Sequence, residues 1–330
     1  MTADPNKTDL TRRQFMTRAA KAGVSIVAAG AAGFWFHDTT GPGPSTPGES
    51  NIRLPDFSIP DVGPKMSIVR GRSRQATLQL ALKSIGGIER FINKGDQVLL
   101  KVNAAFASPQ MLGATTHPQI VSEITRLCLE AGASTVIVAD NPINDPGSCF
   151  ALSGIADAAR SAGARLFLPR DDAFSRYSVP GGSLIRNWPV LYEPLKGINK
   201  IIGTAPVKDH HRSGASMIMK NWYGLLGGRR NIFHQDIQTI ITELAMMIRP
   251  TLVILDGTTT MMTNGPTGGS LADLKETNTI IAGTDQVAVD AFGATLLGRS
   301  LNDLPFIAMA EAAGLGTANY RSLNPVMLEV

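Results

Sequence analysis

The stretch VLLKVN at residues 98–103 decides the fold class, because an apolar run ends there in a lysine and an asparagine. A strand buried in a parallel sheet reads as such a continuous run, and polar residues mark the point where it meets its loop. Five further runs end in the same way: TVIVADN at 135–141, RLFLPRD at 165–171, KIIGTAPVKDH at 200–210, TLVILDG at 251–257 and TIIAGTD at 279–285. Most are followed by a helical pattern. This alternation predicts an α/β fold with a mostly parallel sheet flanked by helices.

The same pattern predicts where a ligand binds. In open parallel sheets, ligands bind in the crevice at the carboxyl ends of the strands. The residues that end the runs are Lys101, Asn103, Asp140, Asn141, Asp171, Lys208, His210, Asp256 and Asp285. We therefore expect a cluster of lysine, aspartate, asparagine and histidine side chains along one edge of one sheet.

The distribution of charge argues against nucleic acid as a partner. The net charge of the whole chain is +4. Residues 1–36 hold five basic and two acidic side chains, a net charge of +3, which leaves +1 for residues 37–330. A nearly neutral body lacks the basic surface that a phosphate backbone requires.

The N-terminus carries a targeting pattern. TRRQFM at residues 11–16 precedes an apolar, Ala/Gly-rich run from Ala22 to Phe36. The adjacent arginines resemble the twin-arginine export signal, which a receptor reads. The resemblance implies the twin-arginine translocase as a partner during export and a periplasmic or other extracytoplasmic location. The run is shorter than an ordinary spanning helix of ~20 residues. Cleavage near Ala29 and retention as a membrane tether both stay open.

The chain divides into three parts. Residues 1–36 form the signal peptide or N-terminal anchor, and residues 37–64 form a linker rich in Pro, Gly and Ser. The α/β domain is expected over residues 65–330. It holds both cysteines, Cys128 and Cys149, and two thiols cannot ligate an iron–sulfur cluster alone. A disulfide between them is permitted outside the cytoplasm, although the apolar pattern around Cys128 favours a buried thiol.

Two lysine-containing pairs have the spacing of neighbours on one face of a strand. Lys101 and Asn103 are two residues apart, as are Lys208 and His210. His211 should point away from His210, because adjacent residues of an extended segment face opposite ways. Solvated strand ends are the alternative interpretation of each pair.

Further candidates lie in the second half of the chain. Lys220 and Asn221 are surrounded by apolar residues, so the lysine must snorkel, pair or have a lowered pKa. Asp290 lies inside the apolar run VAVDAF, where a carboxylate costs free energy unless it pairs structurally or serves a site. Asp285 is most simply the N-cap of the next helix. The glycines of the loop NGPTGGS at 264–270 suit either the approach of backbone N–H groups to an anion or a flexible turn.

Four segments together resemble the domain of unknown function 362 family over roughly residues 65–316: LLKVN, PVKDHHRSGASMIMKNWYG, DGTTTMMTNGPTGG and IIAGTDQVAVDAFGATLLG. The pattern of the family falls here on Lys101 and Asn103, Lys208 and His210, Lys220 and Asn221, Asn264 to Gly268, and Asp285 with Asp290. The resemblance supports the fold and the place of the site. Many members also carry a ferredoxin-like cysteine segment, which this chain lacks.

The leading hypothesis is an exported enzyme that acts on a small anionic substrate, a carboxylate or a phosphate. The residues expected to bind the substrate are Lys101, Asn103, Asn221, Asn264, Gly265, Thr267 and Gly268. Those expected to act in catalysis are Lys208, His210, Lys220, Asp256 and Asp290. A divalent metal is a further option, with Asp140, His210 and Asp256 as candidate ligands. The alternative is a non-catalytic envelope protein that binds or matures a metal, a cluster or a redox partner.

The signal predicts a simple export phenotype. Replacing Arg12 and Arg13 together by lysine should leave the protein in the cytoplasm, because the receptor reads paired guanidinium groups. Fractionation of cells that express the two forms measures this. Equal periplasmic accumulation of the wild-type protein in cells without the twin-arginine pathway would contradict it.

Overall fold

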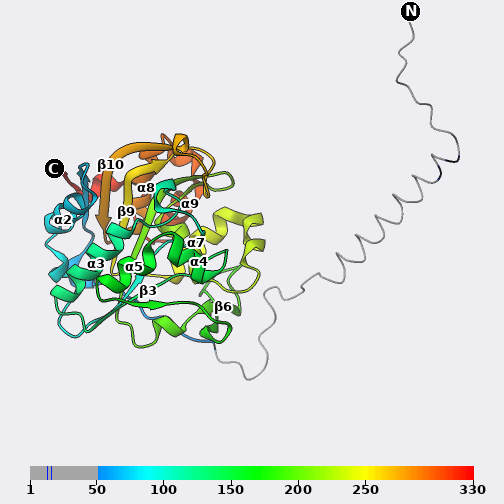
Figure 1. Ribbon diagram of the computed structural model, residues 1–330, viewed down its shortest axis with the longest axis horizontal. Coiled ribbons are helices and arrows are strands. Elements are labelled where there is room, and N and C mark those ends of the chain that lie inside the picture. The colour runs from blue at the N-terminus through cyan, green and yellow to red at the C-terminus, as the bar shows by residue number, and fades with distance from the viewer. Residues whose placement is uncertain (1–12, 14–15, 17–50) are drawn as a thin grey trace, which may run out of the picture. The chain divides into compact units, whose positions relative to one another are not determined.

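The computed structural model describes residues 13, 16 and 51–330, and Figure 1 shows the described body as a coloured ribbon. Apart from Arg13 and Met16, the predicted export signal lies outside the described residues. Residues 37–50 of the predicted linker lie outside them as well. Residues 51–330 belong to the second of two compact units, Pro42–Val330. Within the described part of the chain, no helix is long and apolar enough to cross a membrane.

A nine-stranded mixed sheet forms the centre of the described body. Along the sheet the strand order is β11-β1-β10-β9-β7-β2-β3-β4, and β8 pairs with β7. The strands are β1 Met66–Arg70, β2 Gln97–Lys101, β3 Thr135–Ala139, β4 Arg165–Phe167, β7 Lys200–His210, β8 Gly214–Ser216, β9 Leu252–Met261, β10 Leu274–Gly283 and β11 Val326–Glu329. The pairs β2–β3, β2–β7, β3–β4, β7–β9 and β1–β11 are parallel, which confirms the predicted α/β fold.

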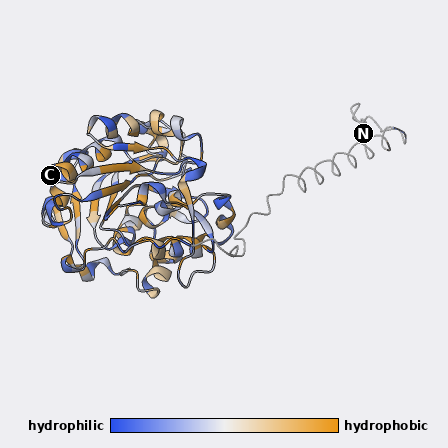
Figure 2. Cartoon of the chain, turned by 90° about the horizontal axis from the view of Figure 1, so that it is seen from below, coloured by the Kyte–Doolittle hydropathy of each residue, from blue (hydrophilic) through white to orange (hydrophobic). Residues whose placement is uncertain are grey.

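Helices cover both faces of this sheet (Figure 1). They are α2 Arg74–Ser84, α3 Pro118–Glu130, α4 Pro146–Leu152, α5 Ile155–Ser161, α6 Ile218–Asn221, α7 Ile237–Met247, α8 Gln286–Leu296 and α9 Pro305–Ala312. Alternate strand residues feed two separate hydrophobic clusters. Leu99 packs with apolar residues of α6 to α9, whereas Leu100 packs with those of α2, α3 and α5. Figure 2 shows the hydrophobic colour along the strands that these helices cover.

Two segments between the larger strands have different outcomes. The sequence pattern predicts one helix over residues 151–162, but the structure has two short helices, α4 and α5. For residues 172–196, around Pro180 and two glycines, the sequence predicts a hairpin or cap, and the antiparallel pair β5 Phe174–Tyr177 and β6 Trp188–Leu191 confirms the hairpin.

The direction of β10 corrects one part of the predicted edge. This strand runs antiparallel to both of its neighbours, β1 and β9. Its carboxyl end, and with it Asp285, therefore lies at the opposite edge from the ends of β2, β3 and β7. Asp285 instead caps α8, because its Oδ1 accepts hydrogen bonds from Val287 N and Ala288 N, both at 2.9 Å. The expectation of an N-cap is confirmed.

The packed body extends N-terminally of Lys65. Phe57 is 2% exposed and belongs to the main hydrophobic cluster. Its N–H donates to Arg249 O at 3.0 Å, and its carbonyl accepts from Thr251 Oγ1 at 2.7 Å. The last residues of the predicted linker thus contribute to the core.

This packing predicts a measurable stability. Phe57→Ala should lower the free energy of unfolding by about 3–5 kcal/mol, because it deletes a buried ring and leaves a cavity. Urea denaturation checks this, with Leu152→Ala as the control because Leu152 is 57% exposed. Equal midpoints for the two variants would show that residues before Lys65 add little to the core.

Candidate functional site

A cavity of about 460 Å³ opens where β2, β3 and β7 end. We call it the lysine cavity. The predicted residues that line it are Asn103, Asp140, Asn141, Lys208, His210, Lys220 and Asn221. The cavity also has walls that the sequence did not predict, namely Phe106, Tyr223, Arg230 and His234.

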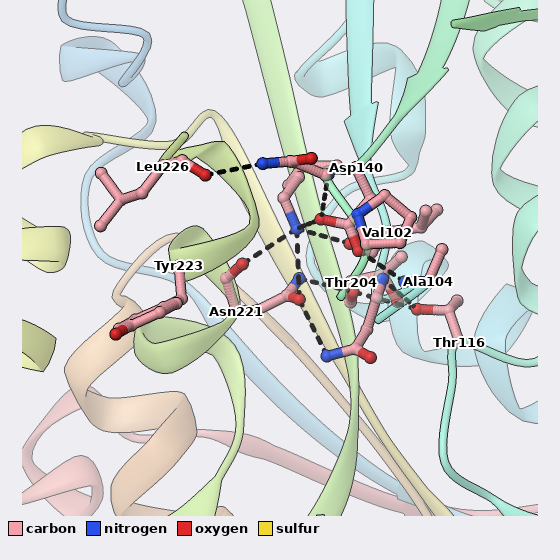
Figure 3. A network of polar contacts seen from close by, with 12 residues as sticks. Val102, Ala104, Thr116, Asp140, Thr204, Asn221, Tyr223 and Leu226 are labelled. Carbon is pink, nitrogen blue, oxygen red and sulfur yellow. Dashed lines mark hydrogen bonds and ion pairs between the residues drawn. The ribbon is translucent and has the colours of Figure 1, made fainter. Parts of the chain in front are cut away.

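Lys101 does not line this cavity, but it contacts two residues that do, Asp140 and Asn221. Its side chain is fully buried, and its Nζ forms an ion pair with Asp140 Oδ1 at 2.7 Å. The same Nζ donates to Val102 O at 2.6 Å and to the backbone and side-chain oxygens of Asn221, at 2.9 and 3.3 Å (Figure 3). Burial lowers the pKa of Lys101, and Asp140 opposes that shift. With its protons committed to these acceptors, Lys101 is a structural cation rather than a ligand contact.

Asp140 connects the ends of two strands. Its Oδ2 accepts from Ala104 N at 2.6 Å, and its Oδ1 accepts from Asn141 N at 3.0 Å. Gly224 passes so close that a Cβ at that position would lie 1.8 Å from Asp140 Oδ1. Only glycine allows the segment after α6 to close over this ion pair.

The amides of Asn103 and Asn221 form a hydrogen bond next to Lys101. Asn103 Nδ2 donates to Asn221 Oδ1 at 3.1 Å, and Asn221 Nδ2 donates to Thr204 O at 3.0 Å (Figure 3). Asn103 is only 7% exposed, yet its Oδ1 has no hydrogen-bond partner among the described residues. Buried polar atoms are almost always paired. This oxygen therefore lacks a donor, in a side chain that lines the cavity.

Asp290 does not reach the lysine cavity, which corrects its predicted catalytic role. Its two carboxylate oxygens accept from Ile218 N and Met219 N, each at 2.9 Å. Complete burial raises the pKa of Asp290 to about 7. The carboxylate thus fixes the start of α6, the short helix that carries Lys220 and Asn221. It positions two site residues and does not itself line the cavity.

Lys208 enters the cavity from the end of β7. Its side chain is 1% exposed, and its Nζ donates to Ala114 O at 2.5 Å and lies 5.4 Å from the centre of the Phe106 ring. No described carboxylate forms an ion pair with it. Burial and the charge of Lys220 lower the pKa of Lys208 to about 7.

Lys220 is the second cation of the cavity. Its Nζ lies 5.5 Å from the centre of the Tyr223 ring, and it has no hydrogen bond or ion pair to any residue in the described part of the chain. Burial and the nearby Arg230 lower the pKa of Lys220 to about 8. Arg230 itself is occupied, because its guanidinium donates to the carbonyls of four residues: Asn141, Pro142, Tyr223 and Leu226.

Three histidine rings stack beside these lysines. The ring of His210 lies 4.9 Å from that of His211 and 5.9 Å from that of His234. The expectation that His210 and His211 point opposite ways is wrong, because His211 belongs to the turn after β7, where strand alternation ends. His234 lies in the 3-10 segment Arg230–Asp236, directly before α7.

The tautomer of His210 follows from its hydrogen bonds. Its Nδ1 accepts from Arg212 N and Ser213 N, both at 3.2 Å. Burial and the surrounding positive groups lower the pKa of His210 to about 2, so the ring is neutral at ordinary pH. A neutral ring whose Nδ1 accepts carries its proton on Nε2. It therefore offers a hydrogen-bond donor, and its Nε2 lacks the lone pair that a metal would need.

Asp256 lies away from the lysine cavity, contrary to its predicted catalytic role. It forms an ion pair with Arg74 at 2.8 Å and lines a separate cavity of about 120 Å³ together with His117. The reason is its register on β9, since Asp256 shares the face of Ile254, which packs with α2 and α3. His117 caps α3, where its Nδ1 accepts from Gln119 N at 3.2 Å.

The loop 264–270 also contributes less than expected. Asn264 Nδ2 donates to Asp273 Oδ1 at 2.6 Å. A Cβ at Gly265 would lie 1.9 Å from Asp209 O, so this glycine serves close packing against β7. From this loop only Pro266 lines the lysine cavity, and the predicted ligand contacts of Asn264, Gly265, Thr267 and Gly268 are absent from its lining.

The candidate metal ligands do not converge. Asp140 pairs with Lys101, Asp256 pairs with Arg74 in the separate cavity, and His210 presents Nε2–H. Among the described residues, no group of three or more His, Cys, Asp or Glu side chains could hold a metal ion. Cys128 and Cys149 are buried free thiols, and burial raises the pKa of Cys128 to about 12.

Sequence reasoning missed Arg230 and His234. The role of Arg230 depends on two nearby carbonyls, of Tyr223 and Leu226, and on the carbonyls of residues 141 and 142 in a distant segment. His234 reaches the site only through the fold of the segment before α7. Neither position has a local motif that could have identified it.

The buried ion pair yields a stability prediction. Asp140→Asn should lower the free energy of unfolding by about 3–5 kcal/mol, because it leaves the Lys101 ammonium buried without its counter-charge. Adding Lys101→Met should restore part of that loss. Urea denaturation at pH 7 measures both effects. Glu130→Gln is the control, because its exposed pair with Arg126 should be worth less than about 1 kcal/mol. A double variant no more stable than Asp140→Asn would contradict the assignment.

Comparison with known proteins finds one relative by sequence and several by structure. This chain is 26% identical over 272 residues to a thylakoid-associated protein of Synechocystis sp., covering 76% of this chain and 79% of that protein. Among solved structures, the lactate racemase apoprotein of Thermoanaerobacterium thermosaccharolyticum aligns with a TM-score of 0.39 and 12% identity, covering 74% of this chain and 61% of that one. A Thermotoga maritima protein aligns with a TM-score of 0.36 and 10% identity, covering 74% of this chain and 60% of that one. This chain thus spans less than two thirds of either solved chain.

The sequence model of one family, described as domain of unknown function (DUF362), matches residues 98–295. That range is more than half of the chain. It runs from β2 to α8 and contains every residue of the lysine cavity named above. The chain therefore belongs to the domain of unknown function 362 family.

Proposed function

We propose that this protein is an enzyme that acts on a small anionic substrate, a carboxylate or a phosphate, held in the lysine cavity. One observation carries the proposal. Lys220 lines the cavity without an ion-pair or hydrogen-bond partner among the described residues, and it interacts electrostatically with Lys208 and Arg230. Positively charged side chains this close together repel one another, and a bound anion relieves that repulsion.

The charges of the cavity support an anion rather than a neutral ligand. Among the described residues, Asp140 is the only carboxylate in its lining, and its ion pair is with Lys101. Lys208, Lys220 and Arg230 form no ion pair with a described carboxylate, and the charge of Asp140 only partly opposes the lowered pKa of Lys208 and Arg230. An oxyanion would accept charge-assisted hydrogen bonds from Lys220, and from Lys208 in its protonated form.

A second feature restricts the chemical class of the ligand. The buried Oδ1 of Asn103 needs a donor, which a bare carboxylate or sulfate does not supply. A ligand that carries both an anionic group and a hydroxyl or amino group would satisfy the lysines and Asn103 together. Small hydroxy acids, amino acids and protonated phosphates have this combination.

The protonation states favour catalysis over simple binding. Lys208 and Lys220 have pKa values of about 7 and about 8, while His210, at about 2, stays neutral. Groups that share a cavity and have strongly shifted pKa values are typical of acid–base sites. An anion that binds but is never converted would favour the non-catalytic binding protein instead.

The proposed location is outside the cytoplasm, with a membrane tether if the signal is retained. This part of the proposal rests on TRRQFM at residues 11–16 and the apolar run that follows it. A resident metal is left out of the proposal because the candidate ligands Asp140, His210 and Asp256 are committed to other partners.

The proposal predicts that anions stabilise the folded protein. Phosphate or propionate present at 100 times its dissociation constant should add about 2.7 kcal/mol to the free energy of unfolding. The melting temperature should therefore rise by several degrees. Lys208→Ala should abolish the rise, and Lys208→Arg should restore only part of it, because a planar guanidinium does not replace a compact ammonium. Differential scanning fluorimetry measures all three proteins.

The same response should depend on pH in a defined direction. Both lysines lose their charge as pH rises through about 7 and about 8, so the anion-induced rise should shrink between pH 6 and pH 9. Lys83→Met serves as the control, because Lys83 is an exposed lysine of α2 that does not line the cavity. If no anion changes the wild-type melting curve at pH 6, the proposed function is wrong.

A further inference from the structure

The lysine cavity contains two lysines that differ in one respect that matters chemically. Lys208 is held by one hydrogen bond, to Ala114 O at 2.5 Å, against the face of Phe106. Lys220 has no such anchor among the described residues and lies beside Arg230, whose guanidinium is fully engaged. An amine held by one hydrogen bond is suited to attack, and an ammonium without a protein acceptor is suited to bind a charged group.

We propose that Lys208 forms an imine with the carbonyl carbon of a small 2-oxo acid, while Lys220 binds the carboxylate of that acid. This inference rests on the proposed function, because it assigns a covalent role within the same anion site. It names the substrate class as a carboxylic acid with an adjacent carbonyl group. Such an acid gains the hydroxyl donor that Asn103 Oδ1 lacks when it adds to the amine.

The surroundings of Lys208 favour its neutral, nucleophilic form. It is 1% exposed, it has no carboxylate partner in the described chain, and the ammonium of Lys220 lies close enough to repel a second positive charge. Its pKa of about 7 leaves about half of the amine unprotonated at neutral pH. Lysines buried beside another cation are activated in this way for covalent catalysis.

Lys101 shows by contrast what a structural lysine looks like. It is equally buried, but Asp140 neutralises it and three further acceptors occupy its protons. It therefore has neither a free lone pair nor access to the cavity. The two buried lysines differ in their partners, not in their burial.

The reaction balances with groups that the cavity supplies. The Lys208 amine forms a bond to the carbonyl carbon, and the electron pair of the C=O π bond moves to oxygen. A proton passes from nitrogen to that oxygen, giving a carbinolamine. The carbinolamine hydroxyl can donate to the unpartnered Oδ1 of Asn103, and the Nε2–H of His210 can stabilise the developing oxyanion. Loss of water then leaves the C=N bond, and the released water is the only by-product.

Reductive trapping tests the inference on the full chain. The wild-type protein is incubated with pyruvate and sodium cyanoborohydride at pH 7.5, and the product is analysed by intact mass and peptide mapping. We expect one reduced pyruvate adduct, located on Lys208. Propionate, which has the same carboxylate but no ketone, should give none. Lys101 and the exposed Lys83 are the internal controls and should stay unmodified at the pyruvate concentration that saturates Lys208.

The pH dependence and one variant sharpen the test. The neutral fraction of an amine with a pKa of about 7 rises from about one tenth at pH 6 to about nine tenths at pH 8. The initial trapping rate, corrected for pyruvate occupancy, should follow that rise. Lys208→Arg keeps a cation and loses the nucleophile, so it should lose the adduct while retaining part of its melting response to propionate. If this variant does not fold, competition on the wild-type protein replaces it. Added phosphate should then suppress the trapping of pyruvate on Lys208. At a pyruvate concentration high enough to label Lys83, phosphate should leave the labelling of Lys83 unchanged.

The outcomes separate the two proposals. A melting temperature raised by both pyruvate and propionate, with no adduct on Lys208, would overturn the imine and leave the anion site standing. An adduct on Lys220 instead of Lys208 would overturn the assignment of the nucleophile. No melting response to either acid, and no adduct, would overturn the anion site and the imine together.

Discussion

The buried ion pair between Lys101 and Asp140 is the constraint on which the site depends. A fully buried ammonium is costly unless a counter-charge and hydrogen bonds satisfy it completely. Here the partners come from three segments: β2 supplies Lys101, the end of β3 supplies Asp140, and α6 supplies both oxygens of Asn221. Satisfying this one charge therefore fixes two strand ends and a helix relative to one another. Figure 3 shows Asp140 and Asn221 on either side of that centre.

The remaining charges divide into those that build the cavity and those left for a ligand. The aspartates at the end of β3, within β9 and in α8 serve structure: Asp140 pairs with Lys101, Asp256 with Arg74, and Asp290 with the backbone of α6. The guanidinium of Arg230 donates its hydrogen bonds to carbonyls of two loops and so links them. Lys208 and Lys220 form no ion pair with a described carboxylate, and of these two lysines Asp140 acts on Lys208 only from a distance. This imbalance, rather than any single residue, is what makes the cavity suited to an anion.

The sequence predicted the strands well because a buried parallel strand needs a continuous apolar run, and such runs are readable without the fold. It was less reliable for the direction of a strand. TIIAGTD reads like the other runs, yet β10 is antiparallel and places Asp285 at the far edge. Periodicity specifies which residues alternate but not which way the chain runs. The same limit explains Asp256, whose apolar run is correct but whose register directs the carboxylate to the face of α2 and α3.

The sequence by itself determined the fold class, the lysine–asparagine strand end, the Lys208–His210 pair and the Lys220–Asn221 segment, since each depends on residues close together in the chain. Only the tertiary structure decided what each charge does. Lys101 and Lys208 look alike in sequence, as lysines that end apolar runs, and both are buried. One meets a carboxylate from β3, whereas the other meets a carbonyl and a second lysine. The protonation state of a buried amine is set by groups that the fold brings from distant segments. A linear sequence does not specify how close those groups lie to the amine.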